Sequence, residues 1–157
     1  MSLEIRSPKY ERASINIPEE VAHLQKNFNG TICSNKGDEY QIANNVVDLL
    51  GEDPVSMSWA QSSNHWKVTA ALYEDIWRKR SLSILTGEEF PIEKERELLI
   101  NWLQPQPGKK YLDLGCSTAL YGRLIKKEQP ECTVVSLDFS KQMLQEARMK
   151  AEAEETD

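Results

Sequence analysis

The chain has 157 residues, of which 39% are hydrophobic and 28% charged, and its formal net charge is −6. This length suffices for one ordinary domain, or for a small domain plus part of another. The acidic balance, with no basic face visible, argues against nucleic-acid binding, and no apolar run approaches the ~20 residues that span a bilayer.

Residues 1–54 are predicted to be a small β-containing N-terminal module. Residues 1–30 are polar and irregular, with one helix expected from Pro18 to about Phe28, because proline followed by two glutamates suits a first helical turn. Three short strands follow, with a turn at residues 35–38 between the first two. They are expected at residues 31–33, 40–42 and 46–50.

Residues 55–107 are predicted to be a helical connector. Residues 55–63 are a predicted loop, and apolar residues then recur at helical spacing from Trp66 to about Ile84. Pro91 is expected to open a second helix. The inner face of that helix is predicted to carry Ile92, Leu98, Leu99, Trp102 and Leu103.

Residues 108–157 are predicted to form the N-terminal part of a Rossmann-like α/β domain. Strands are expected at 111–114 and 132–138, and helices at about 119–128 and 140–154, with Ser140 as an N-cap. This order describes a right-handed βαβ unit with one further helix. A parallel sheet of two strands has open edges, so we expect either missing chain beyond Asp157 or a homo-oligomeric partner that covers the open edge.

The turn after the first of these strands is the most informative segment. Gly115 can adopt a positive φ, and Ser117 and Ala119 are small enough to let a ligand approach the backbone. The helix that begins near Ala119 directs its N–H groups and positive dipole end at the same place. Asp138, at the end of the second strand, can accept from both hydroxyls of a ribose. Together these features predict a pocket for the adenosine half of a cofactor.

The sequence favours S-adenosylmethionine over a dinucleotide as that cofactor. The fingerprint G-x-G-x-x-G is reduced to Gly115-x-Ser117-x-x-Leu120, so two of three glycines are absent. S-adenosylmethionine has no phosphate and carries two cationic groups, so the acid Asp113 favours it and would repel a pyrophosphate. A fragment of a nicotinamide-dependent oxidoreductase stays an alternative, because Asp138 suits both ligands.

Two segments carry a resemblance to a known family. Residues 110–121 resemble motif I of the class I S-adenosylmethionine-dependent methyltransferases, and residues 136–144 resemble the family's second motif, so the resemblance covers about residues 108–155. It implies binding of S-adenosylmethionine, with the ribose on Asp138 and the adenine near Phe139 and Met143. The implied cofactor-binding residues are Asp113, Gly115, Cys116, Ser117, Ala119, Asp138, Phe139 and Met143.

A second resemblance covers residues 30–107. The predicted strands there are similar to a zinc-ribbon-like module that precedes the methyltransferase domain in some UbiE-like enzymes, including cyanobacterial and plastid ones. A zinc site needs about four Cys or His ligands at paired spacing. Only Cys33 remains of such a set, so a degenerate ribbon without metal is predicted. The resemblance implies a small, quinone-like or lipophilic methyl acceptor, and no catalytic residue is assigned.

For some of these residues a structural role is a simpler explanation than a catalytic or binding role. Cys116 has the position of a nucleophile, but no His lies nearby, and packing is favoured; Cys132 is predicted to be core. The cysteine number is odd and the spacings are wide, which favours a reducing, cytoplasmic compartment.

A non-enzymatic module that binds a partner protein is the second alternative to a methyltransferase. The aromatic set Trp59, Trp66, Tyr73 and Trp77 could roof an apolar substrate pocket. Helical packing explains Tyr73 and Trp77 without a ligand, and packing is favoured.

Overall fold

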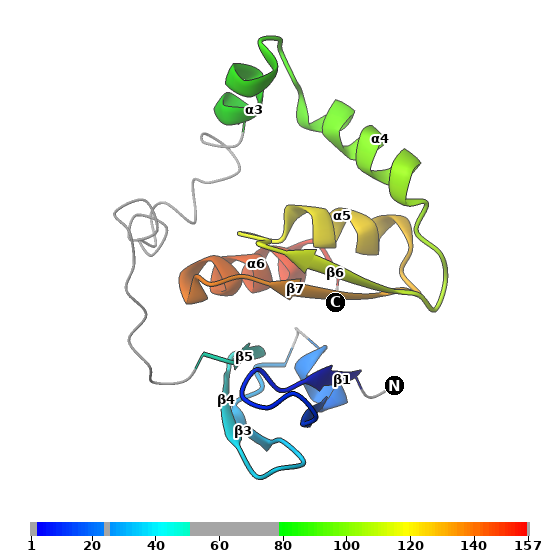
Figure 1. Cartoon of the computed structure of the whole chain (residues 1–157). Coiled ribbons are helices and arrows are strands. Elements are labelled where there is room, and N and C mark those ends of the chain that lie inside the picture. Colours follow the sequence, from blue (N-terminus) through cyan, green and yellow to red (C-terminus); the bar gives the residue numbers. More distant parts are fainter. Residues whose placement is uncertain (1–2, 24–25, 51–78, 157) are drawn as a thin grey trace. The chain divides into compact units, whose positions relative to one another are not determined.

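The computed structural model describes residues 3–23, 26–50 and 79–156. The chain divides into two compact units, one reaching to Ser56 and the other running from Met57 to Thr156. Figure 1 labels most of the helices and strands of the two units.

The N-terminal unit consists of two small antiparallel sheets. Strands β1 (Leu3–Arg6) and β2 (Ser14–Ile17) form a hairpin. Strands β3 (Gly30–Cys33), β4 (Glu39–Ala43) and β5 (Val46–Asp48) form a second sheet in that order. An isolated bridge between Ile15 and Ser34 joins the two sheets. The three strands predicted for this region are confirmed, and so is the turn between β3 and β4.

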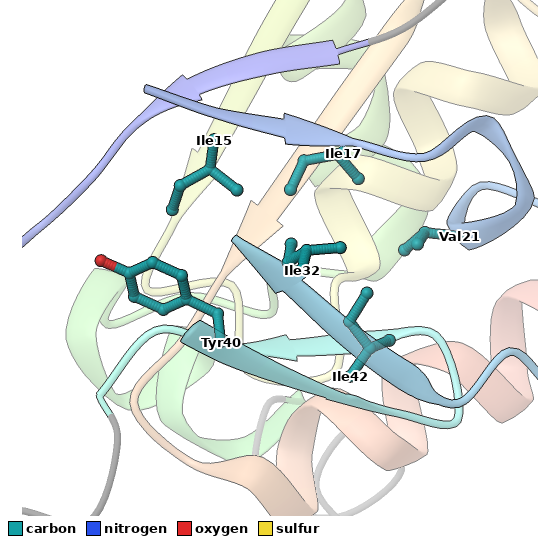
Figure 2. Packing of buried hydrophobic residues seen from close by; sticks show 6 residues of the cluster. All are labelled: Ile15, Ile17, Val21, Ile32, Tyr40 and Ile42. Carbon is teal, nitrogen blue, oxygen red and sulfur yellow. The ribbon is translucent and has the colours of Figure 1, made fainter. Parts of the chain in front are cut away.

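The core of this unit lies between its two sheets. Strand residues alternate in burial, so that Ile15 and Ile17 of β2 point inward while Asn16 between them is exposed, as the two-residue period of a strand requires. Figure 2 shows the buried cluster of six side chains, which is Ile15, Ile17, Val21, Ile32, Tyr40 and Ile42. The Tyr40 hydroxyl shares a hydrogen bond of 2.6 Å with the Ser7 hydroxyl, so the one polar group in the cluster has a partner.

Two predictions for the first thirty residues are wrong. The segment is not irregular, because it contains the β1–β2 hairpin. The helix expected over residues 18–28 is reduced to a single 3₁₀ turn, η1 (Glu19–Val21). The side-chain amide of Asn45 donates to the carbonyls of Glu20, Val21 and His23 at 3.4, 3.0 and 3.3 Å, and these are carbonyls that a continuing helix would have used.

The C-terminal unit follows the strand–helix order that the sequence predicts. Strands β6 (Lys110–Leu114) and β7 (Thr133–Leu137) are parallel neighbours, with Asp113 opposite Ser136. Helix α5 (Leu120–Glu128) connects them, and α6 (Lys141–Ala153) follows β7. The predicted α/β class and parallel pairing are confirmed.

Helix α5 packs closely on one face of this sheet. A Cβ atom placed on Gly122 would lie 2.7 Å from Ser136 Oγ and 3.2 Å from Val134 Cγ1, so a larger residue would force these side chains or the helix to shift. The neighbouring positions along both strands belong to the opposite face. There Leu112 and Leu114 are 63% and 73% exposed, so this apolar face is bare within the described residues.

Charged side chains join α5 to the end of α6. Arg123, only 4% exposed, forms an ion pair with Glu154, and Lys127 Nζ lies 2.8 Å from the other carboxylate oxygen of Glu154. Burying a guanidinium requires such a counter-charge. The residues that follow α6 are therefore part of the packing of this unit.

The connector is described only from residue 79. Helix α3 (Lys79–Thr86) ends two residues after the predicted Ile84, and helix α4 (Ile92–Leu103) begins directly after Pro91, as predicted. The predicted loop at 55–63, the earlier part of the first helix and the aromatic set that includes Trp77 lie outside the described residues. No described helix has the length and hydropathy that crossing a bilayer requires.

The predicted inner face of α4 is wrong at its last two positions, because Leu103 is 37% exposed and Trp102 is more exposed still. Trp102 is 82% exposed, and the buried residue of the helix is Glu95. The Tyr121 hydroxyl on α5 donates to Glu95, and Arg96 pairs with Glu128 at 3.6 Å. Polar contacts near the start of α4 hold it to α5, and no described element covers its last turn.

Candidate cofactor-binding site

The turn between β6 and α5 contains three left-handed residues at alternate positions. Their φ angles are 72° at Gly115, 51° at Ser117 and 54° at Ala119. Only glycine adopts this conformation without strain, and other L-residues lose roughly 1–2 kcal/mol each there. The chain therefore keeps the backbone path of a glycine-rich turn while using serine and alanine at two of its three special positions.

Backbone hydrogen bonds fold this turn onto the end of β7. The N–H groups of Gly115 and Cys116 both donate to the Leu137 carbonyl, at 2.8 and 3.1 Å. The Ala119 N–H donates to the Cys116 carbonyl at 2.8 Å, and the Arg123 N–H donates to the Ala119 carbonyl at 2.9 Å. The carboxyl ends of the two strands are thus joined directly, where α/β sheets commonly bind ligands.

Asp138 connects the two strand-end loops. Its Oδ2 accepts from the Ser117 N–H and its Oδ1 from the Ser140 N–H, both at 2.8 Å. Ser140 caps α6 as predicted, since its Oγ accepts from the Met143 N–H at 3.3 Å. Each carboxylate oxygen has more than one lone pair, so Asp138 keeps acceptor capacity while it holds the two loops together.

Asp113 supports the start of α5. Its Oδ2 accepts from the Gly122 N–H at 3.1 Å. The N-cap residue Ala119 has no side-chain acceptor, so the carboxylate satisfies one of the N–H groups that a helix start leaves without an intrahelical partner. A negative charge is also favourable at this end of the helix dipole. The acid before the turn thus has a structural role that the sequence analysis did not assign.

Cys116 lies near both carboxylates. Its side chain is 6% exposed. Burial raises the pKa of the thiol most, the negative charges of Asp113 and Asp138 add to the effect, and the resulting pKa is about 12. A thiol with a raised pKa is a poor nucleophile at neutral pH. The structure therefore favours the packing role for Cys116.

The remaining predicted site residues differ in accessibility. Gly115 faces open space, because a Cβ atom placed there would meet nothing within 4 Å. Phe139 is 38% exposed, whereas Met143 is only 1% exposed and belongs to the interior. Cys132 is 2% exposed, which confirms the prediction that it is core.

The sequence analysis missed the role of Gly122. Its backbone N–H binds Asp113, and its missing side chain lets α5 approach Ser136. The available signal was a small residue seven positions after Gly115, inside the predicted helix, where glycine costs stability unless packing requires it.

The segment that builds this turn matches a known family. Residues 105–157 match the family model of a methyltransferase domain. The matched residues include β6, α5, β7, α6 and every predicted cofactor-binding residue, and the match supports a methyltransferase function for this part of the chain. No curated protein matches the chain.

Proposed function

We propose that the chain binds S-adenosylmethionine at the β6–α5 turn and functions in methyl transfer. The observation that carries the proposal is the position of Asp138, whose carboxylate lies against the Ser117 N–H in the left-handed turn. An acid at the end of the second strand is where a ribose would be held. The methyltransferase-domain match over residues 105–157 supports the same assignment.

The residues around the turn suit this cofactor. Gly115 leaves open space beside the backbone, and the free acceptor sites of Asp138 suit two ribose hydroxyls. The ring of Phe139 is partly exposed next to that acid and suits an adenine face. Asp113 contributes negative charge that suits a cationic ligand better than a pyrophosphate. The cofactor itself would supply an electrophilic methyl group.

The chain's own contribution to methyl transfer is positioning. Asp138 and the turn would fix one end of the cofactor, which leaves the methyl group aligned for a direct displacement by an acceptor. We propose a small, quinone-like or lipophilic acceptor. The resemblance of residues 30–107 to UbiE-like enzymes supports that choice.

Calorimetric titration tests this assignment. S-adenosylhomocysteine should bind to the whole chain, and NAD should not. Asp138→Asn keeps the size of the side chain but removes the charge and one of the two acceptor oxygens, and should weaken S-adenosylhomocysteine binding at least tenfold, about 1.4 kcal/mol. Glu131→Gln, an exposed acid of the same unit, is the matched control and should leave binding unchanged.

Two outcomes would overturn the proposal. Binding of NAD in preference to S-adenosylhomocysteine would favour an oxidoreductase fragment. A folded chain that binds neither nucleotide but retains a protein in a pull-down would favour the partner-binding module. Circular dichroism of each variant shows whether the fold is kept.

A further inference from the structure

A hollow in the N-terminal unit combines two cationic side chains with an aromatic ring. It has a volume of about 320 Å³ and is lined by Tyr10, Arg12, Ala13 and Lys36. The first three residues belong to the loop between β1 and β2, and Lys36 belongs to the turn between β3 and β4. Ala13 is 1% exposed, so the loop is anchored in the core directly beside the hollow.

Hydrogen bonds fix the two loops beside each other. The Ser14 N–H donates to Asn35 Oδ1 at 3.1 Å, and the Asn35 N–H donates to the Ser14 carbonyl at 2.9 Å. The Ser34 hydroxyl accepts from the Lys36 N–H at 3.2 Å, within the same turn. The backbones that carry Arg12 and Lys36 are therefore held in place, and a ligand there would not have to order them.

The charges at this hollow are cationic. Within the described residues, Arg12 and Lys36 have no ion pair and no side-chain hydrogen bond. The acids Glu4 and Glu11 line an adjoining hollow of about 550 Å³, which shares Arg12 with the first. The guanidinium can therefore turn toward an anion in the first hollow, against competition from two exposed carboxylates.

We propose that this hollow binds a small organic anion that carries a carboxylate or phosphate group on an apolar body. The Arg12 guanidinium offers paired donors to such a group, and the Lys36 ammonium adds a point charge. The Tyr10 ring and the Ala13 methyl group supply an apolar wall. The volume lies near the lower end of small-molecule sites, so it suits a compact ligand such as a substituted ring.

Nuclear magnetic resonance titration of the whole chain tests this site. Phenyl phosphate and benzoate are the two anion probes, and inorganic phosphate is the probe without an apolar body. Either organic anion should shift the amide signals of residues 10–13 and 35–37 with a dissociation constant in the millimolar range. The stronger of the two identifies the preferred anion.

Variants at the hollow separate the contribution of charge to the binding affinity from the contribution of the apolar wall. Arg12→Gln should weaken binding of the preferred probe about tenfold, and Lys36→Gln by a similar factor. Tyr10→Ala should remove the advantage of phenyl phosphate over inorganic phosphate. Lys26→Gln removes an exposed cation of the same unit that does not line the hollow, and should change the affinity less than twofold.

The results that overturn the proposal are equally distinct. Shifts that are absent at both loops, or spread over the surface of the chain, would exclude a site here. An equal loss in Lys26→Gln and Arg12→Gln would show that net charge alone attracts the probe. Both results are independent of S-adenosylhomocysteine binding.

Discussion

Gly122→Ala tests the packing that positions the candidate site. The new Cβ atom would lie 2.7 Å from Ser136 Oγ, 3.2 Å from Val134 Cγ1 and 3.5 Å from Asp113 Oδ2. Overpacking of this kind costs about 1–3 kcal/mol, whereas alanine gains about 1 kcal/mol over glycine in a helix. The expected net loss in the free energy of unfolding is therefore about 1 kcal/mol.

The same substitution in a Ser136→Ala background isolates the close contact. Removing the Ser136 hydroxyl leaves Val134 Cγ1 as the nearest neighbour at 3.2 Å, which a small shift relieves. The loss caused by Gly122→Ala should then disappear or change sign, giving a coupling energy of about 1 kcal/mol between the two positions.

Guanidinium unfolding followed by tryptophan fluorescence measures these unfolding free energies in the C-terminal unit. Within the described residues the only tryptophan is Trp102, which lies in helix α4 of the C-terminal unit. A loss of about 1 kcal/mol also lowers the melting temperature of this unit by about 4–8 °C, the shift expected for a cooperative unit of roughly 100 residues. If Gly122→Ala stabilised the protein in the parental background, or if the two substitutions were strictly additive, the close approach of α5 to β7 would be refuted.

Three further substitutions or treatments probe the site and its support. Cys116 should resist iodoacetamide at about pH 8, because its pKa of about 12 keeps the thiol protonated at that pH. Mass spectrometry should find the exposed Cys33 labelled first. Ser117→Gly should raise the free energy of unfolding by up to about 1 kcal/mol, since relief of left-handed strain exceeds the added freedom of the unfolded chain. Glu154→Gln should lower it by about 2 kcal/mol, because Arg123 stays buried without its counter-charge. Chemical unfolding measures both energies.

Each of these expectations has a distinct contrary result. Equal labelling rates for Cys33 and Cys116 would contradict the raised pKa. A Ser117→Gly variant less stable than the parent would mean that the turn carries no strain at that residue. Glu155→Gln is the control for Glu154, because Glu155 is an exposed neighbour, and it should change stability by less than about 0.5 kcal/mol.

The C-terminal unit was predictable because its signals are local. Ser140 caps the helix that follows it, Pro91 precedes α4, and the small residues of the turn directly follow β6. What the sequence analysis missed there depends on atoms far apart in the sequence. The bond from Gly122 to Asp113 spans nine residues, and the bond from Tyr121 to Glu95 spans 26.

The first thirty residues show more clearly that contacts between distant residues escape a prediction from local sequence. The alternation of Leu3 and Ile5 with polar residues was a usable strand signal, and it belongs to the β1–β2 hairpin. The helix expected after Pro18 follows from correct local rules, but Asn45, more than twenty residues away, binds the carbonyls of that segment. Tertiary hydrogen bonds therefore overrode local propensity.

The two described hydrophobic clusters share no residue, and this has a consequence for how the chain loses its structure. One cluster is built around Ile15 and Tyr40, the other around Cys116, Ala119 and Ala147. We expect each core to unfold as a cooperative unit of its own, so that a single melting temperature would describe neither of them. Heating should produce two overlapping heat-absorption peaks, and a substitution in one core should displace only its own peak.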